Sequence, residues 1–388
     1  MMRIAYLNKV KMDEALPAVN FTFFNALGLA QAGVETHLFV QANHPDFSCG
    51  DVQSLFGMDS PPLLNWHILP VQKKWGIRSN QWFYRDVIKH LRRMHNTTPL
   101  DAVISRDPGA LPYLARLRSR LGIPVFYQPH NFYVDLSLRP DLNPRNARKY
   151  HLLEKRYIGR LSGLLCLQES QAELYRRYFP ALPVMASPPG FVRFEDYDPG
   201  RFRRRLLGYS GSLQLKKGVK VLIDALDILQ NDGGDYQVIL IGGRNQTEIK
   251  EIESYIIAKG LESRVEITGW ISFKEVNTLL KKISVGVMPL TDIFYNRYLT
   301  APNKLFDYLS HTTPVIGSDL PSIRDFIKNG HEGILVEAEN GKALAAAITE
   351  IFADEMKYKQ FVDACRQTGE KYLWKERGRA MLNLIRES

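Results

Sequence analysis

Residues 302–310, PNKLFDYLS, place an amide, an ammonium group and a carboxylate close together. If this segment begins a helix, its free N–H groups attract an anion, and Lys304 beside Asn303 adds a full positive charge. Asp307, three residues from Lys304, has two interpretations: a surface ion pair with that lysine, or an acceptor for a diol such as a ribose. The segment therefore predicts either a solvated helix start or a binding site for phosphate and sugar groups.

Lys216 and Lys217 form a second candidate phosphate site. They stand in a short loop between the strand-like run LLGYSGS and a helical pattern that follows Gly218. Turn amides next to small residues such as Gly211 and Ser212, with a lysine beside them, are how α/β proteins hold phosphates. Ordinary solvated lysines are the alternative. The dinucleotide fingerprint GxGxxG of dehydrogenases does not occur in the sequence.

The first half of the chain places polar residues at two predicted strand ends. His130 and Asn131 follow PVFYQ, and Arg106 and Asp107 follow AVIS. Groups at the carboxyl ends of parallel strands face ligands in α/β folds. A loop histidine with a surface or capping role is the alternative for His130.

The elements that would position these residues alternate between strand and helix. RIAYLN, THLFV, AVIS, PVFYQ and LLCLQ are strand-like in the first half, and LLGYSGS, YQVILIGG, VEITG, VGVMPL, PVIGSD and GILVE in the second. This alternation of strands and helices predicts two doubly wound α/β domains with parallel sheets. We expect an N-terminal domain over 1–186, a Pro- and Gly-rich linker over 187–205, a C-terminal domain over 206–370 and a helix over 371–388 that crosses back to the first domain.

Composition fits two globular domains and an anionic partner. The 388 residues are 45% hydrophobic and carry a net charge of +10. Residues 1–200 hold 24 basic and 17 acidic side chains, a surplus of +7, which favours an anionic partner or a solubilising surface. Cys49, Cys166 and Cys365 are too few and too far apart for a disulfide framework. With neither a signal peptide nor a membrane-spanning run in the sequence, we expect a cytoplasmic protein.

Three further segments have competing interpretations. Residues 75–95 alternate apolar and basic side chains, as in a helix lying on an anionic membrane or covering a sheet. Asp196 and Asp198 spell the DxD metal signature, but they lie in the linker and no metal role is expected. The basic run 201–205 has no interleaved aromatic platform, so nucleic acid is not an expected partner, and a solvated linker or an inter-domain ion-pair site is predicted.

Several segments together resemble the retaining glycosyltransferases of the large family 4, which have the GT-B fold. They are YSGSLQLKKGVKVLIDAL, VEITGW, ISRDPG, PVFYQPHN and PNKLFDYLSHTTPVIGSDLPSIRDFIKNGHEGILVE, in the family's order. The resemblance implies two Rossmann-like domains facing across a cleft. It also implies transfer of a sugar from a nucleotide-diphosphate donor, without a metal or other cofactor.

The resemblance also assigns residues. Lys217 matches the family lysine that holds the donor diphosphate, and Ser212 stands where an arginine is usual. Asp307 matches the second glutamate of a paired-glutamate motif that binds the donor ribose, and Leu299 replaces the first. His130 matches the histidine near the transferred sugar.

The predicted site thus has two sets of residues. His130 and Lys217 are the expected catalytic residues. The expected donor-binding residues are Gly211, Ser212, Lys217, Trp270 beside the nucleobase pocket, Asn303, Lys304 and Asp307.

The predicted function is transfer of a sugar, with retention of its configuration, to a hydroxyl group of an acceptor. The acceptor would be a glycan, a lipid-linked molecule or a small molecule. If residues 75–95 bind a membrane, the protein would act at its inner face. Two alternative functions stay open. Because Leu299 and Ser212 differ from the family pattern, the protein could be a non-catalytic subunit that binds a nucleotide sugar. It could also be a sugar-nucleotide epimerase of the same architecture, which would need no acceptor.

Overall fold

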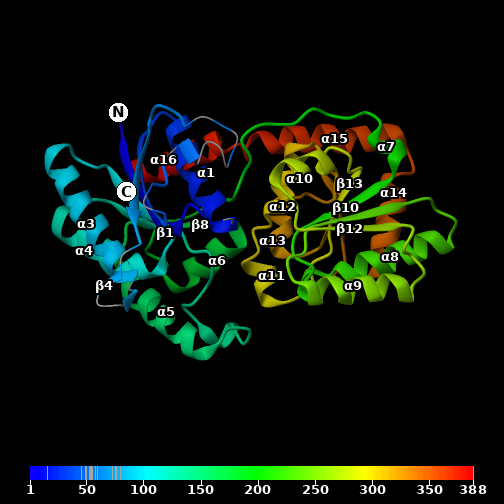
Figure 1. Ribbon diagram of the computed structural model, residues 1–388, viewed down its shortest axis with the longest axis horizontal. Coiled ribbons are helices and arrows are strands. Elements are labelled where there is room, and N and C mark those ends of the chain that lie inside the picture. The colour runs from blue at the N-terminus through cyan, green and yellow to red at the C-terminus, as the bar shows by residue number, and fades with distance from the viewer. Residues whose placement is uncertain are drawn as a thin grey trace. The chain divides into compact units, whose positions relative to one another are not determined.

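The computed structural model describes residues 1–387 except 15, 45, 49, 52–55, 57, 59, 72, 75, 76 and 79. The chain divides into two compact units, Met1–Val192 with Leu373–Ser388, and Arg193–Tyr372. The border lies within the segment predicted as a linker. Each unit contains its own sheet and hydrophobic core, and Figure 1 shows helices around each sheet.

Unit 1 is a doubly wound parallel sheet. Its described strands run in the order β3-β2-β1-β6-β7-β8-β9, and every neighbouring pair is parallel. The strands are β1 Arg3–Lys11, β2 Glu35–Ala42, β3 Leu64–Pro70, β6 Ala102–Ser105, β7 Val125–Tyr127, β8 Gly163–Cys166 and β9 Val184–Ala186, beside a small hairpin of β4 Lys73–Lys74 and β5 Ile77–Arg78. The helices are α1 Pro17–Gln31, α3 Asn80–Thr97, α4 Leu111–Leu121, α5 Pro144–Tyr157, α6 Glu169–Tyr178 and α16 Trp374–Glu387, with short 3₁₀ turns η1 Pro108–Ala110, η2 Leu136–Leu138 and η3 Ile158–Arg160.

Unit 2 has the strand order of a dinucleotide-binding fold. Its described strands run β12-β11-β10-β13-β14-β15, all parallel, so the order reverses between β10 and β13. The strands are β10 Leu206–Ser210, β11 Gln237–Ile241, β12 Val265–Gly269, β13 Val285–Met288, β14 Val315–Ser318 and β15 Gly333–Val336. The helices are α7 Arg201–Arg204, α8 Val219–Asn231, α9 Gln246–Ala258, α10 Phe273–Leu280, α11 Phe294–Tyr298, α12 Asn303–Ser310, α13 Pro321–Arg324, α14 Gly341–Ile351 and α15 Glu355–Glu370, with the 3₁₀ turn η4 Leu215–Lys217. The predicted fold class, two Rossmann-like α/β domains, is confirmed.

The last helix of the chain packs on the first. Figure 1 shows α16 beside α1, and two glycines bring them into backbone contact. A Cβ atom on Gly378 would lie 2.3 Å from the carbonyl oxygen of Gly28, and one on Gly28 would lie 2.3 Å from the carbonyl oxygen of Trp374. Because no Cβ fits there, the two helices can approach this closely only with glycine at both positions.

In the described part of the basic segment 75–95, the helix is α3, Asn80–Thr97, and it packs against the sheet of unit 1. Over α3 the apolar side chains of Phe83, Val87, Ile88 and Leu91 are buried, and the helix packs against β1 and α4. Its apolar face is therefore occupied by the core and is not available to a membrane. Residues 75, 76 and 79 of the predicted segment lie outside the described residues. Across the described part of the chain, no helix is both long and apolar enough to cross a bilayer.

The arginine run 201–205, at the end of the predicted linker, was predicted to be solvated or ion-paired, and this prediction is wrong for Arg201. Arg201 is only 1% exposed, and its guanidinium donates to the hydroxyl of Thr313 at 2.7 Å. Arg204 does pair with Asp198, at 2.9 Å, within its own unit. Arg201 is buried because its guanidinium bonds the turn that leads into β14, an interaction that sequence spacing does not reveal. Cys166 and Cys365 are free and buried, and Cys49 lies outside the described residues.

Candidate active site

The candidate site of unit 2 lies where its strand order reverses. The loop after β10 carries Gly211, Ser212 and Lys217, and the segment after β13 leads to α12, which carries Lys304 and Asp307. Ligands of open α/β sheets bind beyond the carboxyl ends of the strands at this reversal. The fold therefore brings together two segments that are about 90 positions apart in the sequence.

Glycines shape the loop after β10. Gly211 has a φ of +139°, and a Cβ atom there would lie 3.3 Å from Lys304 Nζ. Gly218 has a φ of +70°, and its Cβ would lie 1.6 Å from the carbonyl oxygen of Pro289. The hydroxyl of Tyr209 donates to the carbonyl oxygen of Ser212 at 2.6 Å and holds the start of the loop. Any side chain at Gly211 would therefore crowd the ammonium group of Lys304.

Lys304 presents a buried ammonium group. Its Nζ lies 3.7 Å from the centroid of the Tyr209 ring and has no hydrogen-bond partner among the described residues. Burial, and after it the charge of Lys217, lowers the pKa of Lys304 well below its usual value, against a smaller opposite effect of Asp307. Proteins rarely bury a cation without a partner, because each such group costs stability. The arrangement fits a group that an anionic ligand completes.

Lys217 ends the turn η4 and lies close enough to act on Lys304 electrostatically. Burial, with the charge of Lys216, lowers the pKa of Lys217 to about 8. Its Nζ lies 5.6 Å from the ring centroid of Tyr295. The carbonyl oxygen of Lys216 accepts hydrogen bonds from Asn296 Nδ2 and from Thr291 Oγ1, each at 2.9 Å. The segment 291–298 therefore holds in place the turn that carries Lys216 and Lys217, which we call the lysine loop.

Tyr295, Asn296 and Thr291 were not predicted as site residues. The only sequence signal was the polar and aromatic character of the loop that contains them. Their contacts with Lys216 and Lys217 depend on the reversal of strand order, which brings the two loops together.

Helix α12 begins at Asn303, within the segment PNKLFDYLS that was predicted to start a helix. Pro302 is the N-cap residue, no side chain caps the helix, and Asn303 is exposed. Asp307 is half-buried, and burial raises its pKa to about 7, although the charge of Lys304 opposes the shift. It does not hydrogen-bond to Lys304 Nζ, so the predicted surface pair is not formed. Leu299 is 2% exposed and packs into the core.

Trp270 lies apart from the lysines, at the end of β12, which is two positions from β10 in the sheet. Its indole is 59% exposed, and the guanidinium carbon of Arg244 lies 3.9 Å from the ring centroid. A stacked arginine and tryptophan form a flat apolar and cationic platform. Arg244 was not predicted from the sequence.

His130 belongs to unit 1, where it follows β7 and has an exposed side chain. Partial desolvation of the ring, and after it the charge of Arg106, lowers the pKa of His130 to about 4. The imidazole is therefore neutral at pH 7 and can accept a proton or a hydrogen bond. Beside it, Gln128 is buried and accepts a hydrogen bond from the Tyr6 hydroxyl at 2.8 Å.

Glu154 anchors the loop that carries His130. Its buried carboxyl group accepts from the Tyr133 amide at 2.9 Å and lies 3.2 Å and 3.3 Å from the hydroxyls of Tyr175 and Tyr127. The Tyr175 hydroxyl also donates to the carbonyl oxygen of Asn131 at 3.0 Å. Sequence reasoning missed Glu154, because a single acidic residue in a basic helix carries no periodic signal. The loop that carries His130 is therefore held by hydrogen bonds to Glu154 and Tyr175, which are distant from it in the sequence.

Compared with the wild type, we expect the Glu154→Gln variant to be more stable at pH 8 than it is at pH 5.5. Burial raises the pKa of Glu154 to about 8, so its neutral form contributes stability below about pH 4.5, and this stability is lost as the pH rises through 8. Glutamine keeps the shape and never ionises, so the variant should gain about 1–3 kcal/mol relative to the wild type between the two pH values. Thermal unfolding at both pH values measures this gain, with exposed Glu173→Gln as the control. Equal pH slopes in wild type and Glu154→Gln would contradict a neutral Glu154.

One of the two DxD residues of the linker, Asp198, has structural partners. Asp198 accepts from the amide of Gly200 and from Arg204 Nη2, both at 2.9 Å. In the part of the chain that the structure describes, no group of three or more His, Cys, Asp and Glu side chains is arranged to hold a metal ion.

Comparison with known proteins matches a glycosyltransferase domain to each unit. Residues 25–190 match a family described as "Glycosyl transferase 4-like domain", and residues 204–354 match "Glycosyl transferases group 1". The alpha-D-kanosaminyltransferase of Streptomyces kanamyceticus is 24% identical over 47% of this chain and 46% of its own length. The phosphatidyl-myo-inositol mannosyltransferase of Mycobacterium leprae is 24% identical over 41% of this chain and 40% of its own. The matches thus span less than half the length of these relatives.

Solved structures share the fold over the whole chain. Sucrose-phosphate synthase from Thermosynechococcus elongatus has a TM-score of 0.73 at 16% identity and covers 100% of this chain and 99% of its own. HepE of Anabaena, solved in complex with UDP, has a TM-score of 0.73 at 16% identity with 100% of both chains covered. From the two matched domains and this shared fold, we conclude that the chain belongs to the GT-B glycosyltransferases that resemble family 4.

Proposed function

We propose that the protein transfers a glycosyl group from a nucleotide-diphosphate sugar to a hydroxyl group of an acceptor. The observation that carries this proposal is the buried ammonium group of Lys304, which has no hydrogen-bond partner in the described residues and lies beside the Gly211 loop. A diphosphate supplies the negative charge that this position lacks. The UDP in the Anabaena structure of the same fold supports a nucleoside diphosphate as the ligand.

The proposed reaction exchanges one bond at the anomeric carbon for another. The bond from that carbon to the diphosphate oxygen breaks, the acceptor oxygen forms the new bond, and a nucleoside diphosphate leaves. Lys217, Lys304 and the uncapped amides at the start of α12 would stabilise the negative charge that grows on the leaving group. We propose that these groups act without a resident metal ion and that the sugar configuration is retained.

The remaining residues are proposed to orient the substrates. The carboxylate of Asp307 would accept hydrogen bonds from the ribose hydroxyls, and the platform of Trp270 and Arg244 would face the nucleobase. His130, neutral at pH 7, would orient the sugar or take up the acceptor proton. The acceptor is proposed to be a glycan, a lipid-linked molecule or a small molecule, and the location cytoplasmic.

A non-catalytic nucleotide-sugar binding subunit is the second candidate. It is favoured by one observation: Leu299, at the position of the first glutamate of the pair, is 2% exposed and apolar. Such a side chain can neither accept a hydrogen bond from the donor nor stabilise a charge on it.

A thermal-shift screen tests donor binding directly. UDP, GDP, ADP and their glucose and mannose conjugates are added at millimolar concentration to the wild type and to Lys217→Ala. A ligand at 100 times its Kd stabilises the native state by about 2.7 kcal/mol, so we expect a shift with one nucleotide in the wild type and a much smaller one in the variant. No shift with any nucleotide would overturn the proposed donor site.

Release of free nucleoside diphosphate then separates the two candidates. The donor found by the screen is incubated with a panel of hydroxyl acceptors, and the nucleoside diphosphate is quantified by coupled assay. Release above the protein-free rate with at least one acceptor supports the transferase. Binding without release across the panel supports the binding subunit.

A further inference from the structure

Exposed cations gather on one surface of unit 1, and no described acidic residue lines the two hollows there. Helix α5, the 3₁₀ turn η3 and helix α4 are consecutive or packed on one another there. The exposed basic residues that line two adjacent hollows on them are Arg145, Arg148, Lys149 and Arg156 of α5, Arg160 of η3, and Arg116, Arg118 and Arg120 of α4. We refer to these eight residues as the α4–α5 cationic surface.

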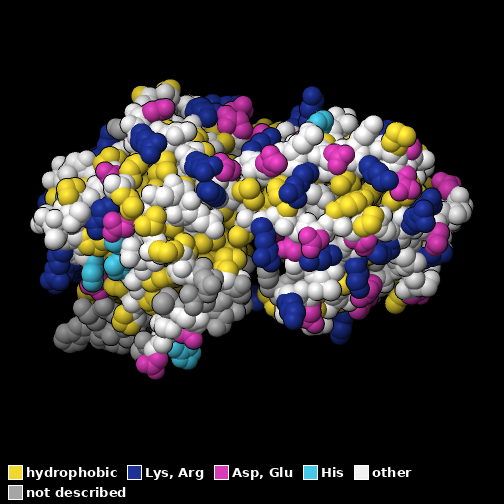
Figure 2. Space-filling view, turned by 90° about the horizontal axis from the view of Figure 1, so that it is seen from above, with side chains coloured by type: hydrophobic (Ala, Val, Ile, Leu, Met, Phe, Trp, Pro, Cys, Tyr) yellow, Lys and Arg dark blue, Asp and Glu magenta, His cyan; other side chains and the backbone are white. Residues whose placement is uncertain are grey.

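The charge of this surface is not compensated. Within the described residues, none of the eight side chains forms an ion pair. The one acidic residue of α5, Glu154, is buried and points its carboxyl group at Tyr133. On the face shown in Figure 2, by contrast, Lys and Arg side chains are interspersed with Asp and Glu. A cluster of like charges costs free energy by repulsion and therefore favours an anionic partner.

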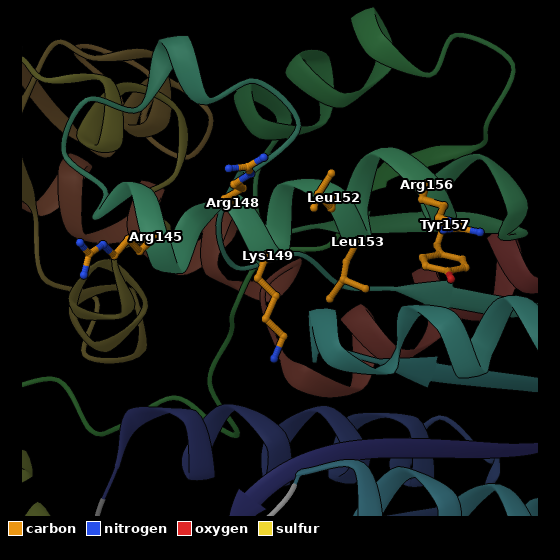
Figure 3. A pocket seen from close by; sticks show the side chains of 7 residues that line it. All are labelled: Arg145, Arg148, Lys149, Leu152, Leu153, Arg156 and Tyr157. Atoms are coloured by element: carbon orange, nitrogen blue, oxygen red, sulfur yellow. The ribbon is translucent and has the colours of Figure 1, made fainter.

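An apolar residue stands in the middle of the cations. Arg148, Leu152 and Arg156 are spaced four residues apart on α5, so they follow one another along one face of the helix. Leu152 is 59% exposed, and Figure 3 shows it between the two arginines. The hollow there is lined by Leu152, Leu153 and Tyr157 together with four of the cations of α5, namely Arg145, Arg148, Lys149 and Arg156. Cations around an exposed apolar side chain are the chemistry of a helix that lies in a lipid headgroup layer.

We propose that the α4–α5 cationic surface docks the protein onto a bilayer of anionic phospholipids. The cations contact lipid phosphates, and Leu152 enters the headgroup layer. A soluble polyanion would use the charges but not Leu152, which is why the bilayer is the favoured partner. This surface differs from α3, whose apolar face is buried. The proposal is independent of sugar transfer.

Vesicle flotation tests the proposal on the full chain. Vesicles of phosphatidylcholine alone, and of phosphatidylcholine with 30% phosphatidylglycerol, are compared at low and high salt. We expect binding only to the anionic vesicles, and release at about 0.5 M salt, where the screening length falls to a few ångströms. Each cation near an anionic surface contributes a factor of about five in partitioning. A variant with four cations of α5 neutralised should therefore partition at least about 100-fold less. Its substitutions are Arg145→Gln, Arg148→Gln, Lys149→Gln and Arg156→Gln.

A matched control shows whether binding depends on the charge of the α4–α5 cationic surface or only on the net charge of the protein. The control removes four exposed lysines elsewhere, as Lys250→Gln, Lys274→Gln, Lys342→Gln and Lys375→Gln. It should keep most of the binding, and Leu152→Ser alone should weaken it several-fold. All substituted positions are exposed, and unchanged thermal unfolding confirms that the variants fold.

Three outcomes would overturn the proposal. They are equal losses in the α5 variant and the control, equal binding to neutral and anionic vesicles, and binding to soluble polyphosphate with none to vesicles. The last would identify a soluble polyanion as the partner. Because no nucleotide sugar is present, none of these outcomes bears on the donor site.

Discussion

Lys217→Ala is expected to lower kcat by about 10²–10³ while the protein stays folded, because we propose that the removed ammonium group stabilises the charge on the departing diphosphate. Loss of one preorganised charge-stabilising group typically costs about 3–4 kcal/mol of barrier. The side chain ends a 3₁₀ turn and is partly buried, and burial lowers its pKa to about 8. Removing it takes away a cation that is costly in the free protein, so the native state should not be weakened. Initial rates with the donor found by thermal shift measure the effect.

The control for this variant is Lys220→Ala. Lys220 lies three residues away, on α8, and its partly exposed ammonium group pairs with Glu251 at 2.8 Å. It carries the same charge but does not belong to the lysine loop. Its kcat should stay within about twofold of the wild type, since exposed ion pairs contribute little. If Lys217→Ala kept its kcat as well, the proposed role of Lys217 would be wrong.

Lys304→Met is expected to act in opposite directions on stability and on ligand binding. Methionine has a similar length and no charge, so it removes the cost of a buried ammonium group whose Nζ lacks a hydrogen-bond partner among the described residues. We expect a gain of about 1–3 kcal/mol, which is roughly 2–10 °C in Tm for a unit of this size. The same change removes the proposed charge-assisted contact with the diphosphate, which would be worth about 10- to 150-fold in affinity.

Two measurements on one variant check this prediction. Thermal unfolding without ligand should give a higher Tm than the wild type, and titration with the nucleoside diphosphate should give a weaker Kd. Lys281→Met is the control, because its ammonium group pairs with Glu195 at 3.0 Å and is 40% exposed. That substitution should change stability by under about 0.5 kcal/mol. A lower Tm in Lys304→Met would show that the native fold depends on this ammonium group.

The sequence predicted every strand of unit 2 and the interior strands of unit 1, but it missed both edge strands of unit 1. The eleven strand-like runs quoted from the sequence coincide with β1, β2, β6, β7, β8 and all six strands of unit 2. β3 and β9 were missed, and both are edge strands with half-buried residues. A strand covered on both faces is a continuous apolar run, whereas β3 mixes polar and apolar residues and β9 is only three residues long, so neither has that signature.

The sequence suggested which residues could form the candidate site, but it did not reveal the environment of their side chains. The sequence indicated that Lys217, Lys304 and Asp307 could serve phosphate and sugar groups, because strand ends and helix starts have known roles. It did not indicate that Lys304 Nζ would be buried over Tyr209. It also did not reveal Arg244 over Trp270, or Glu154 beneath the His130 loop. These contacts join residues whose proximity is set by the order of strands, and no local pattern encodes that order.

The contact between Gly28 and Gly378 has a consequence for synthesis. These glycines are 350 positions apart, so the ribosome makes the second only after every residue of unit 2. Unit 2 is one continuous segment and can fold as soon as it emerges. Unit 1 must wait with the contact face of α1 uncovered until α16 arrives. The unit that begins the chain is therefore the last to be completed, and the interval leaves it exposed to chaperones and proteases.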